Sequence, residues 1–336
     1  LLQHHNQKEQ VMTDEELEKL ERRIARVYRE ARDSLNDTIQ SYFESFKKRD
    51  KEMKELIGTI QNGKEWTEQD YKQWRLNQIG RGRRFEALRD QIAERMTQAN
   101  ETAAAYVNDA TPGIYSLNRN YAAYTIEQVA GDVGFTLWDE ETVRRLIVEE
   151  PDVMPYYPAE KAVKRGIDLA YGKKQITSVV TSGILQGLSI KGLADNLQSR
   201  IPEMNRESAV RTARTAVTGA ENAGRMDSYQ EAQKMGIKMR KEWVATLDSR
   251  TRHSHRMVDG EKIDLKKEFS NGLMYPGDPN GKPAEIYNCR CTMVADLHGI
   301  DTSKANRWSE DPETGKKRKI KDMTYSQWEK WLKNGR

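Results

Sequence analysis

The sequence predicts a mainly α-helical protein in which an elongated helical N-terminal region is followed by a small C-terminal α+β module. Two observations carry this prediction. Apolar residues recur at three- and four-residue steps over most of the first 235 residues. After Gly236 this period is lost, and β-branched, aromatic, Gly and Pro residues dominate. Charged residues make up 32% of the 336 residues and apolar residues only 36%, a balance that favours long, exposed helices over one compact core.

The N-terminal part divides into a flexible tail at residues 1–12 and an elongated helical region at residues 13–135. Thr13 and Glu16 have the spacing of a capping box, in which each side chain bonds to the backbone of the other residue. The apolar seam that follows is narrow. We therefore expect this helix to pair with another, within one chain or between copies.

A second helix is predicted to return antiparallel along the first. Turn residues at 61–64 break the chain, and Thr67 with Asp70 can cap the next helix. The segment Thr111-Pro112-Gly113 is expected to end that helix, and a third helical pattern covers residues 115–129. Arg81 to Arg84 is interpreted as a solvated helix face.

Residues 136–235 are predicted as a helical middle region with a proline-bearing extended linker at 150–158. Its expected helices cover residues 140–148, 159–170, 175–186, 190–201 and 206–235. The last helix has an alanine face and, opposite it, a polar face. We expect the alanines to pack on a neighbouring helix and the polar face to be solvated. That polar face comprises Arg211, Arg214, Thr218, Glu221 and Arg225.

Residues 236–300 are predicted as the small α+β module, with strands at 238–247 and 285–297 joined by a long polar loop. Residues 301–336 form a basic tail with one short amphipathic helix near Trp328.

Composition excludes several classes of protein. No stretch approaches the roughly 20 consecutive apolar residues of a membrane helix, so no membrane span is predicted. The first ten residues lack the basic and apolar regions of a secretory signal. Two cysteines are too few for a disulfide framework, which favours a reducing, intracellular environment. A net charge of +4 does not by itself indicate nucleic acid, so such a contact requires a local patch.

The densest group of reactive side chains is an H-x-H pair followed by a C-x-C pair. His253, His255, Cys289 and Cys291 offer the four ligands that a structural zinc ion takes. Structural zinc sites more often use C-x2-4-C spacing. The alternative is two buried cysteines beside surface histidines.

The order of short motifs across residues 175–297 resembles that of the Mu F-like phage minor head proteins, which are also labelled head morphogenesis proteins. The motifs are Gly183 to Ala194, Arg214-Thr215, Thr246 to Thr251, Asp259-Gly260, Met274-Tyr275-Pro276 and Asn288-Cys289-Arg290-Cys291. This resemblance covers a little over a third of the chain, and the combination is more specific than any single motif.

The resemblance implies a minor structural protein of the phage head. Its implied partners are the portal protein and other head proteins, and genomic DNA bound without sequence preference is expected from the basic run near the C-terminus. It implies several copies per virion, in the capsid interior or at the portal vertex, with assembly in the host cytoplasm and, in some relatives, delivery with the genome.

The resemblance also bears on the candidate zinc site. Many relatives have T-C-x-x-C before the N-C-R-C motif, which makes four cysteines. Here Arg252 and His255 stand at the positions of the two cysteines of T-C-x-x-C. His253 could replace the ligand that is lost at Arg252. The alternative that a hydrogen-bonded knot, meaning a set of hydrogen bonds that joins the same segments, replaces the metal also stays open. Ala216 stands where many relatives have Glu, which weakens a functional interpretation of that helix face.

Two other functions stay open. A nuclease-like enzyme could use Asp248, His253 and His255 as acid and base, with Arg250 and Arg252 holding a phosphate. The sequence has no second acidic cluster for Mg²⁺ and no P-loop, so we expect no catalysis.

The other alternative is a non-specific DNA-binding packaging accessory. Its phosphate contacts would be the basic run near the C-terminus, for which a flexible tail is the alternative interpretation. The run comprises Lys316, Lys317, Arg318, Lys319 and Lys321.

Overall fold

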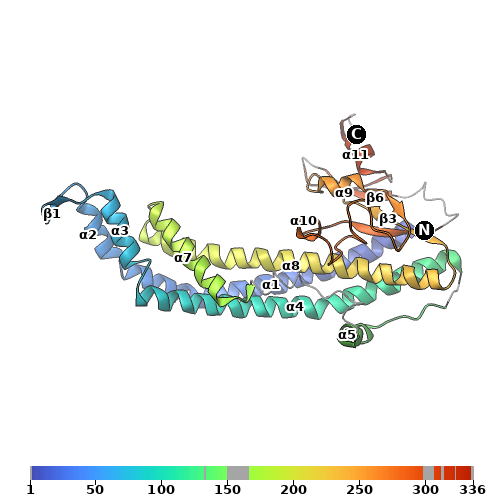
Figure 1. The fold of residues 1–336 in the computed structure, drawn as a ribbon, viewed down its shortest axis with the longest axis horizontal. Helices are drawn as coiled ribbons and strands as arrows, with labels where there is room; N and C mark the ends of the chain where they lie inside the picture. Colours follow the sequence, from blue (N-terminus) through green and yellow to red (C-terminus); the bar gives the residue numbers. More distant parts are fainter. Residues whose placement is uncertain are drawn as a thin grey trace. The chain divides into compact units, whose positions relative to one another are not determined.

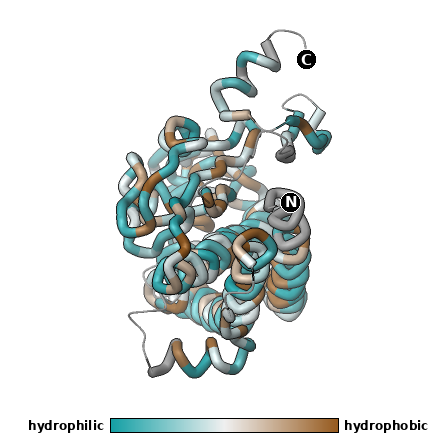
Figure 2. The backbone as a smooth tube through the Cα atoms, turned by 90° about the vertical axis from the view of Figure 1, so that its right-hand side faces the viewer, coloured by the Kyte–Doolittle hydropathy of each residue, from teal (hydrophilic) through white to brown (hydrophobic). Residues whose placement is uncertain are grey.

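The computed structural model describes residues 2–131, 134–149, 166–297, 306–311, 314–321 and 323–333. Within these residues the chain is mainly helical and carries small sheets, which confirms the predicted fold class. Its longest elements are α1 (Leu2–Glu44), α4 (Arg83–Ala130) and α8 (Ile190–Lys234), labelled in Figure 1. In Figure 2, hydrophilic (teal) and hydrophobic (brown) residues are both present in the helices, as amphipathic helices require.

The chain divides into two compact units that interleave along the sequence. One comprises Leu1–Glu21, Val107–Ala159 and Arg211–Arg336, and the other comprises Arg22–Tyr106 and Glu160–Val210. This differs from the consecutive domains that the sequence predicted, because α1, α4 and α8 each contribute residues to both units.

In the second unit, α1 and α4 pair antiparallel, as predicted. Tyr28 donates to Asn100 at 2.5 Å and Arg95 donates to Ser34 at 3.1 Å, so rising numbers on one helix meet falling numbers on the other. The remaining elements of this unit are α2 (Lys47–Glu55), β1 (Ile60–Gln61), β2 (Lys64–Glu65), α3 (Glu68–Gln78) and α7 (Leu169–Leu185).

Several local signals in this unit act as predicted. Asn62 and Gly63 have positive φ angles of 51° and 80° in the β1–β2 turn, the conformation that Asn-Gly favours. Thr67 and Asp70 form the full capping box of α3. Ser189 accepts from the amide of Gly192 at the start of α8.

The predicted start of α1 is wrong. The helix begins at Leu2, so residues 2–12 belong to it and not to a flexible tail. These residues contain no Pro or Gly to stop a helix. Thr13 lies inside the helix, fully buried, and its hydroxyl accepts a hydrogen bond from Asn118 of α4. It stabilises helix pairing, not a helix start.

Two predicted helix boundaries are also absent. The helix α4 continues through Pro112, and α8 continues through Pro202, so the helices predicted at 190–201 and 206–235 are one. A proline removes one backbone hydrogen bond and leaves a carbonyl without its N–H. At Pro112 the hydroxyl of Thr111 lies 3.4 Å from the carbonyl oxygen of Asn108 and donates to it. Packing along both sides of the proline maintains the helix.

The first unit contains the α+β module. An antiparallel sheet has the order β4 (Lys262–Ile263), β3 (Met239–Val244), β5 (Thr292–Leu297), with Trp243 opposite Met293. Alternate residues of β3 are buried, and Trp243 is fully enclosed. The strand predicted at 285–297 is shorter than expected, because Pro283 starts the short helix α10 (Pro283–Ile286).

The end of the chain is ordered where the structure describes it. The strands β6 (Asn306–Glu310) and β7 (Lys317–Lys321) form a hairpin, and α11 (Tyr325–Lys333) buries Tyr325 and Trp328. The helix α5 (Glu140–Glu149) confirms the pattern predicted at 140–148. The proline-bearing linker at 150–158 and most of the helix predicted at 159–170 lie outside the described residues.

No helix in the described part of the chain combines the length and apolarity needed to span a membrane.

Candidate metal centre

Three side chains that are far apart in the sequence meet in the core of the module. His255 lies on α9 (His253–Met257), and Cys289 and Cys291 lie just before β5. The Nδ1 atom of His255 lies 3.4 Å from Sγ of Cys291 and 3.7 Å from Sγ of Cys289. The three potential ligand atoms lie within 4.8 Å of one another, and all three residues are buried.

The fourth predicted ligand, His253, does not join this group. It is exposed on α9, two residues before His255. Residues two apart on a helix point in different directions, so an H-x-H pair on a helix cannot bring both rings to one point. No local sequence signal predicted that this segment is helical.

The C-x-C spacing lets both thiol groups point to the same side because this segment of the chain is extended. Cys289 and Cys291 point inward while Arg290 between them is exposed, as alternation along an extended chain requires. Asn288 precedes them with a positive φ of 53° and reverses the chain after α10. Its amide donates to Thr215 of α8 at 3.1 Å.

The donor set fits a soft divalent metal such as zinc. Two thiols and one imidazole are the ligand types that structural zinc prefers. On the far side of the ring, Nε2 of His255 lies 3.1 Å from Oε2 of Glu285 but makes no hydrogen bond in this arrangement. A carboxylate beside the outer nitrogen is the usual second partner of a metal-binding histidine.

The two thiols differ in acidity. A hydrogen bond from Cys291 lowers the pKa of Cys289, and the nearby guanidinium of Arg252 acts in the same direction. Burial raises the pKa of Cys291 well above its ordinary value. Cys289 is therefore the more acidic thiol of the pair.

Arg252 occupies the place where a family cysteine was expected, and it binds main chain. Its guanidinium donates to the carbonyl oxygen of Glu285 at 3.2 Å and to that of Tyr287. This joins the start of α9 to the turn that follows α10. The hydrogen-bonded knot and the three-ligand cluster are thus both present.

Asp248 lies at the centre of a second buried hydrogen-bond network. It accepts hydrogen bonds from Arg290, from the amide of Arg250 at 2.9 Å and from the hydroxyl of Thr251 at 3.1 Å. Burial alone would raise its pKa, but these bonds, led by Arg290, hold the pKa below its ordinary value. The groups of the nuclease alternative therefore do not share one exposed surface: Asp248 and His255 are almost fully buried, whereas His253 is exposed.

Part of the polar face of α8 is buried, which corrects the expectation that the whole face is solvated. Thr218 donates to the carbonyl oxygen of Cys289 at 2.8 Å, and Glu221 accepts from Thr292 at 3.0 Å. Glu221 also pairs with Arg225 at 2.8 Å, and both are nearly inaccessible. Arg211 and Arg214 of the predicted face are exposed.

Asn222 was not singled out from the sequence, although it follows Glu221 on the same helix. Its Oδ1 atom accepts from the amide of Met293 at 3.0 Å, on the edge of β5 that faces away from β3. The spacing of Thr215, Thr218 and Asn222 by three and four residues was the available signal.

The basic run near the C-terminus lies in the β6–β7 hairpin and not in a flexible tail. Lys317, Lys319 and Lys321 alternate along β7 and are exposed, while Ile320 is buried against α11. Arg318 points to the other side and lies over the ring of Trp331 at 4.4 Å. Lys316 is exposed in the turn before the strand.

Comparison with known proteins adds a family match. Residues 174–294 match the family described as Phage Mu protein F like protein. This segment runs from α7 into β5 and includes His255, Cys289 and Cys291. No solved structure matches the chain.

Three curated proteins are similar over different lengths. The chain is 29% identical to "Minor head protein GP7" of Bacillus phage SPP1, over 74% of this chain and 79% of that protein. It is 25% identical to "NAD(+)--arginine ADP-ribosyltransferase EFV" of Enterococcus faecalis, over 71% of this chain and 49% of that protein. It is 32% identical to "Uncharacterized protein YqbB" of Bacillus subtilis, over 35% of this chain and 40% of that protein.

Proposed function

Residues 174–294 belong to the Mu F-like family of phage head proteins, and on that premise we propose that this structural head protein links the portal, other head proteins and packaged DNA. One relative that covers 74% of the chain is a minor head protein, which supports a place in the virion. We place it at the portal vertex or in the capsid interior, in several copies, assembled in the host cytoplasm. Delivery with the genome is part of the same proposal.

One structural observation supports a structural role. In the module, Asp248, His255, Cys289 and Cys291 are buried, and Arg252 donates to main-chain carbonyl oxygens. Such groups join segments of the chain and are not presented to a substrate. The α8 side chains that hold the edge of β5 serve the same purpose.

Incorporation into heads tests the proposal. Expressed with the portal and capsid proteins of its own phage, the chain should sediment with assembled heads and be recovered with purified portal. Heads that assemble with normal composition and infectivity without this chain would contradict it. Genes for a portal protein upstream and for scaffold or capsid proteins downstream would agree with it.

We further propose that His255, Cys289 and Cys291 hold a structural zinc ion. When bound, zinc would join α9 to the segment before β5 with thiolate and imidazole ligands. A small sheet such as β4–β3–β5 benefits from a cross-link of this kind.

Elemental analysis decides between the zinc site and the knot alone. We expect about one zinc ion per chain, lost in Cys291→Ala and retained in the matched variant His253→Ala, because His253 is exposed. If the freshly purified wild-type chain contains no zinc, the zinc proposal is wrong. The hydrogen bonds from Arg252 to main-chain carbonyl oxygens then join these segments without a metal.

DNA contact is assigned to the exposed lysines of β7. Lys317, Lys319 and Lys321 project from one face of the strand and can neutralise phosphates without reading bases. Changing all three to Ser should flatten the dependence of DNA affinity on salt. Binding that is unchanged in affinity and salt dependence would assign this strand to protein contacts.

The similarity to a protein named as an ADP-ribosyltransferase supports an enzymatic alternative. The chain aligns with only about half of that protein, and this alignment and the one to the minor head protein each cover more than two thirds of this chain. They must therefore overlap, so one part of this chain is similar both to a protein named as a minor head protein and to a protein named as an enzyme. Transfer of label from NAD⁺ to an arginine-rich acceptor protein by the purified chain would move this alternative ahead of a purely structural role.

A further inference from the structure

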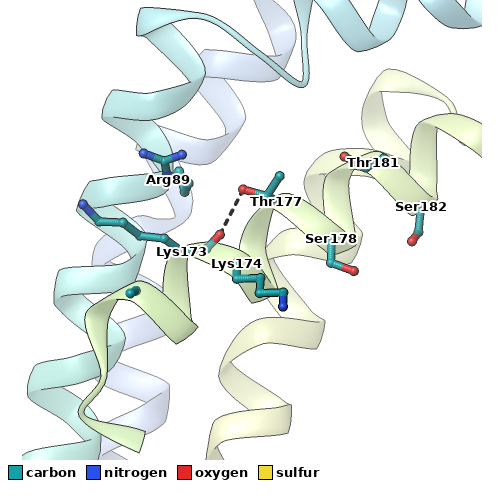
Figure 3. A pocket seen from close by; sticks show the side chains of 8 residues that line it. Arg89, Lys173, Lys174, Thr177, Ser178, Thr181 and Ser182 are labelled. Carbon is teal, nitrogen blue, oxygen red and sulfur yellow. Dashed lines mark hydrogen bonds between the residues drawn. The ribbon is translucent and has the colours of Figure 1, made fainter. Parts of the chain in front are cut away.

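The second unit carries a groove of about 590 Å³ beside α7. Its lining residues come from α7 and α4, and all are basic or hydroxyl-bearing except Ala170. The side chains are shown in Figure 3. They are Arg89, Ala170, Lys173, Lys174, Thr177, Ser178, Thr181 and Ser182.

The spacing of these residues places them on one helix face. Lys173, Thr177 and Thr181 are each four residues apart, and Lys174, Ser178 and Ser182 form a second row beside them. Residues four apart lie next to each other on a helix surface. The rise of a helix separates successive members of a row by about 6 Å. Each row therefore starts with a lysine and continues with hydroxyls.

The hydroxyls of this groove are available for a ligand. Among the described residues, none bonds to the side chains of Ser178, Thr181 or Ser182. Elsewhere, Thr102, Thr125 and Ser199 donate to the carbonyl oxygen one turn earlier in their helices. In the groove only Thr177 does so, donating to Lys173 at 3.0 Å. The three hydroxyls can donate to an acceptor in the groove.

The charge of the groove is positive. Arg89 and Lys173 both pair with Asp90, at 2.8 Å and 3.0 Å, and their bonds, that of Lys173 foremost, lower the pKa of this carboxyl. Lys174 is exposed and has no ion-pair partner among the described residues. Three cations and one carboxylate leave a net charge of +2, and no carboxylate lines the groove itself.

We propose that this groove binds the sugar-phosphate backbone of nucleic acid. Lysine, arginine and hydroxyl side chains are the residues that contact phosphate oxygens. Contacts to phosphate oxygens carry no direct sequence information, so binding to the backbone should not depend on sequence. The inference deepens the proposed contact with packaged DNA and rests on it, but it assigns a second, separate set of residues from β7.

The test uses the full chain in a background where Lys317, Lys319 and Lys321 are changed to Ser, so that β7 does not mask the groove. Binding of a short labelled duplex of random sequence is measured by fluorescence anisotropy over a range of salt concentrations. Replacing Lys173 and Lys174 by Ser should reduce the slope of log affinity against log salt by about 1 for each lysine. Ser178→Lys should increase that slope by a similar amount.

Lys191→Ser is the matched control, because Lys191 is an exposed lysine of α8 outside the groove lining. It should leave the slope unchanged, and unaltered circular dichroism should accompany each variant. Equal slopes for the Lys173/Lys174 variant and the control would overturn the inference. Poly-glutamate binding more tightly than the duplex would also overturn it and indicate an acidic protein segment.

Failure of this inference is distinguishable from failure of the proposed function. A chain that enters heads but shows no change in slope overturns the groove alone. A chain that does not enter heads, yet responds in slope as stated, overturns the head role alone.

Discussion

Gly224 decides how closely α8 approaches α4. A Cβ atom added at this position would lie 2.4 Å from the carbonyl oxygen of Tyr115 and 3.1 Å from the amide nitrogen of Arg119. Both are backbone atoms, which cannot move away without shifting a helix. The buried hydroxyl of Ser228 donates to the carbonyl oxygen of Arg119 at 2.6 Å and fixes the same contact.

Gly224→Ala should therefore destabilise the protein. Overpacking of a tight contact costs about 1–3 kcal/mol, which exceeds the gain of about 0.5–1 kcal/mol from replacing a helical Gly. The matched variant is Gly172→Ala in α7, where the nearest atom lies at an ordinary 3.7 Å. Thermal unfolding followed by circular dichroism should show a lower midpoint for the first variant only. A raised midpoint for Gly224→Ala would show that α8 can move.

Lys241 is a buried charge on β3. Its ammonium donates to the carbonyl oxygens of Leu265 at 3.0 Å and Met274 at 2.7 Å. Burial lowers the pKa of Lys241 to about 8, against the partial compensation of Asp278 and Glu268. An unfolded lysine titrates near 10.4. Between these values the unfolded chain binds more protons, so the contribution of Lys241 to the free energy of unfolding rises with pH.

Lys241→Met should remove that rise. The variant also leaves two carbonyl oxygens without their donor, so its absolute stability falls and only the pH slopes are compared. Urea unfolding followed by tryptophan fluorescence, at pH values below 8 and between 8 and 10, measures both slopes. Identical slopes for the two proteins would show that the pKa of Lys241 is the same in the folded and unfolded states.

At the scale of elements, α8 covers the outer edge of the sheet. The strand β5 pairs with β3 on one side only, and an unpaired edge exposes backbone donors. Asn222 accepts from the amide of Met293, and Arg225 donates to the carbonyl oxygen of the same residue. Helix side chains thus take the place of a further strand.

Asn222→Leu should loosen this edge. The variant leaves a buried amide without an acceptor, which costs about 1–3 kcal/mol. Hydrogen exchange should accelerate at the amide of Met293 more than in β4. Arg211→Ser, an exposed change on the same helix, is the control and should alter neither exchange nor stability. Unchanged protection of Met293 would show that another group satisfies it.

At the scale of the whole molecule, the long helices cover apolar side chains of one another. The seam predicted for the first helix is covered within the chain: Leu20, Ile24 and Leu35 are buried. The helix α8 takes part, since Gln198 donates to the carbonyl oxygen of Asn36 at 3.1 Å. A fragment that ends before α7 lacks this cover.

A fragment of residues 11–130 should therefore be helical and self-associating. Its apolar surface, normally covered by α7 and α8, needs another partner in water. Circular dichroism and sedimentation measure both properties, and a fragment of residues 166–235 added in equal amount should reduce the self-association. A monomeric fragment with little helix would contradict this expectation.

Much of the fold follows from local sequence signals. The period of apolar residues predicts the helices, Asn-Gly predicts the turn after β1, and Thr67 with Asp70 predicts the start of α3. These signals act between residues a few positions apart, so they need no knowledge of the rest of the chain. Because the signals are local, the helix end predicted at Pro112 is wrong. A proline ends an isolated helix, but packing along α4 lets the helix continue past it.

The sequence by itself also determined the set of side chains that could form the candidate centre, but not its geometry. It identified His253, His255, Cys289 and Cys291 as ligand types, and the alternation of an extended chain allowed both thiols to face inward. Only the tertiary structure decided that His253 is excluded, that Arg252 binds carbonyl oxygens and that part of the polar face of α8 is buried. The exclusion of His253 follows from the helical form of α9. The other two depend on contacts between segments more than thirty positions apart, and hydrogen-bond partners at that separation are set by how the elements pack, which no local pattern encodes.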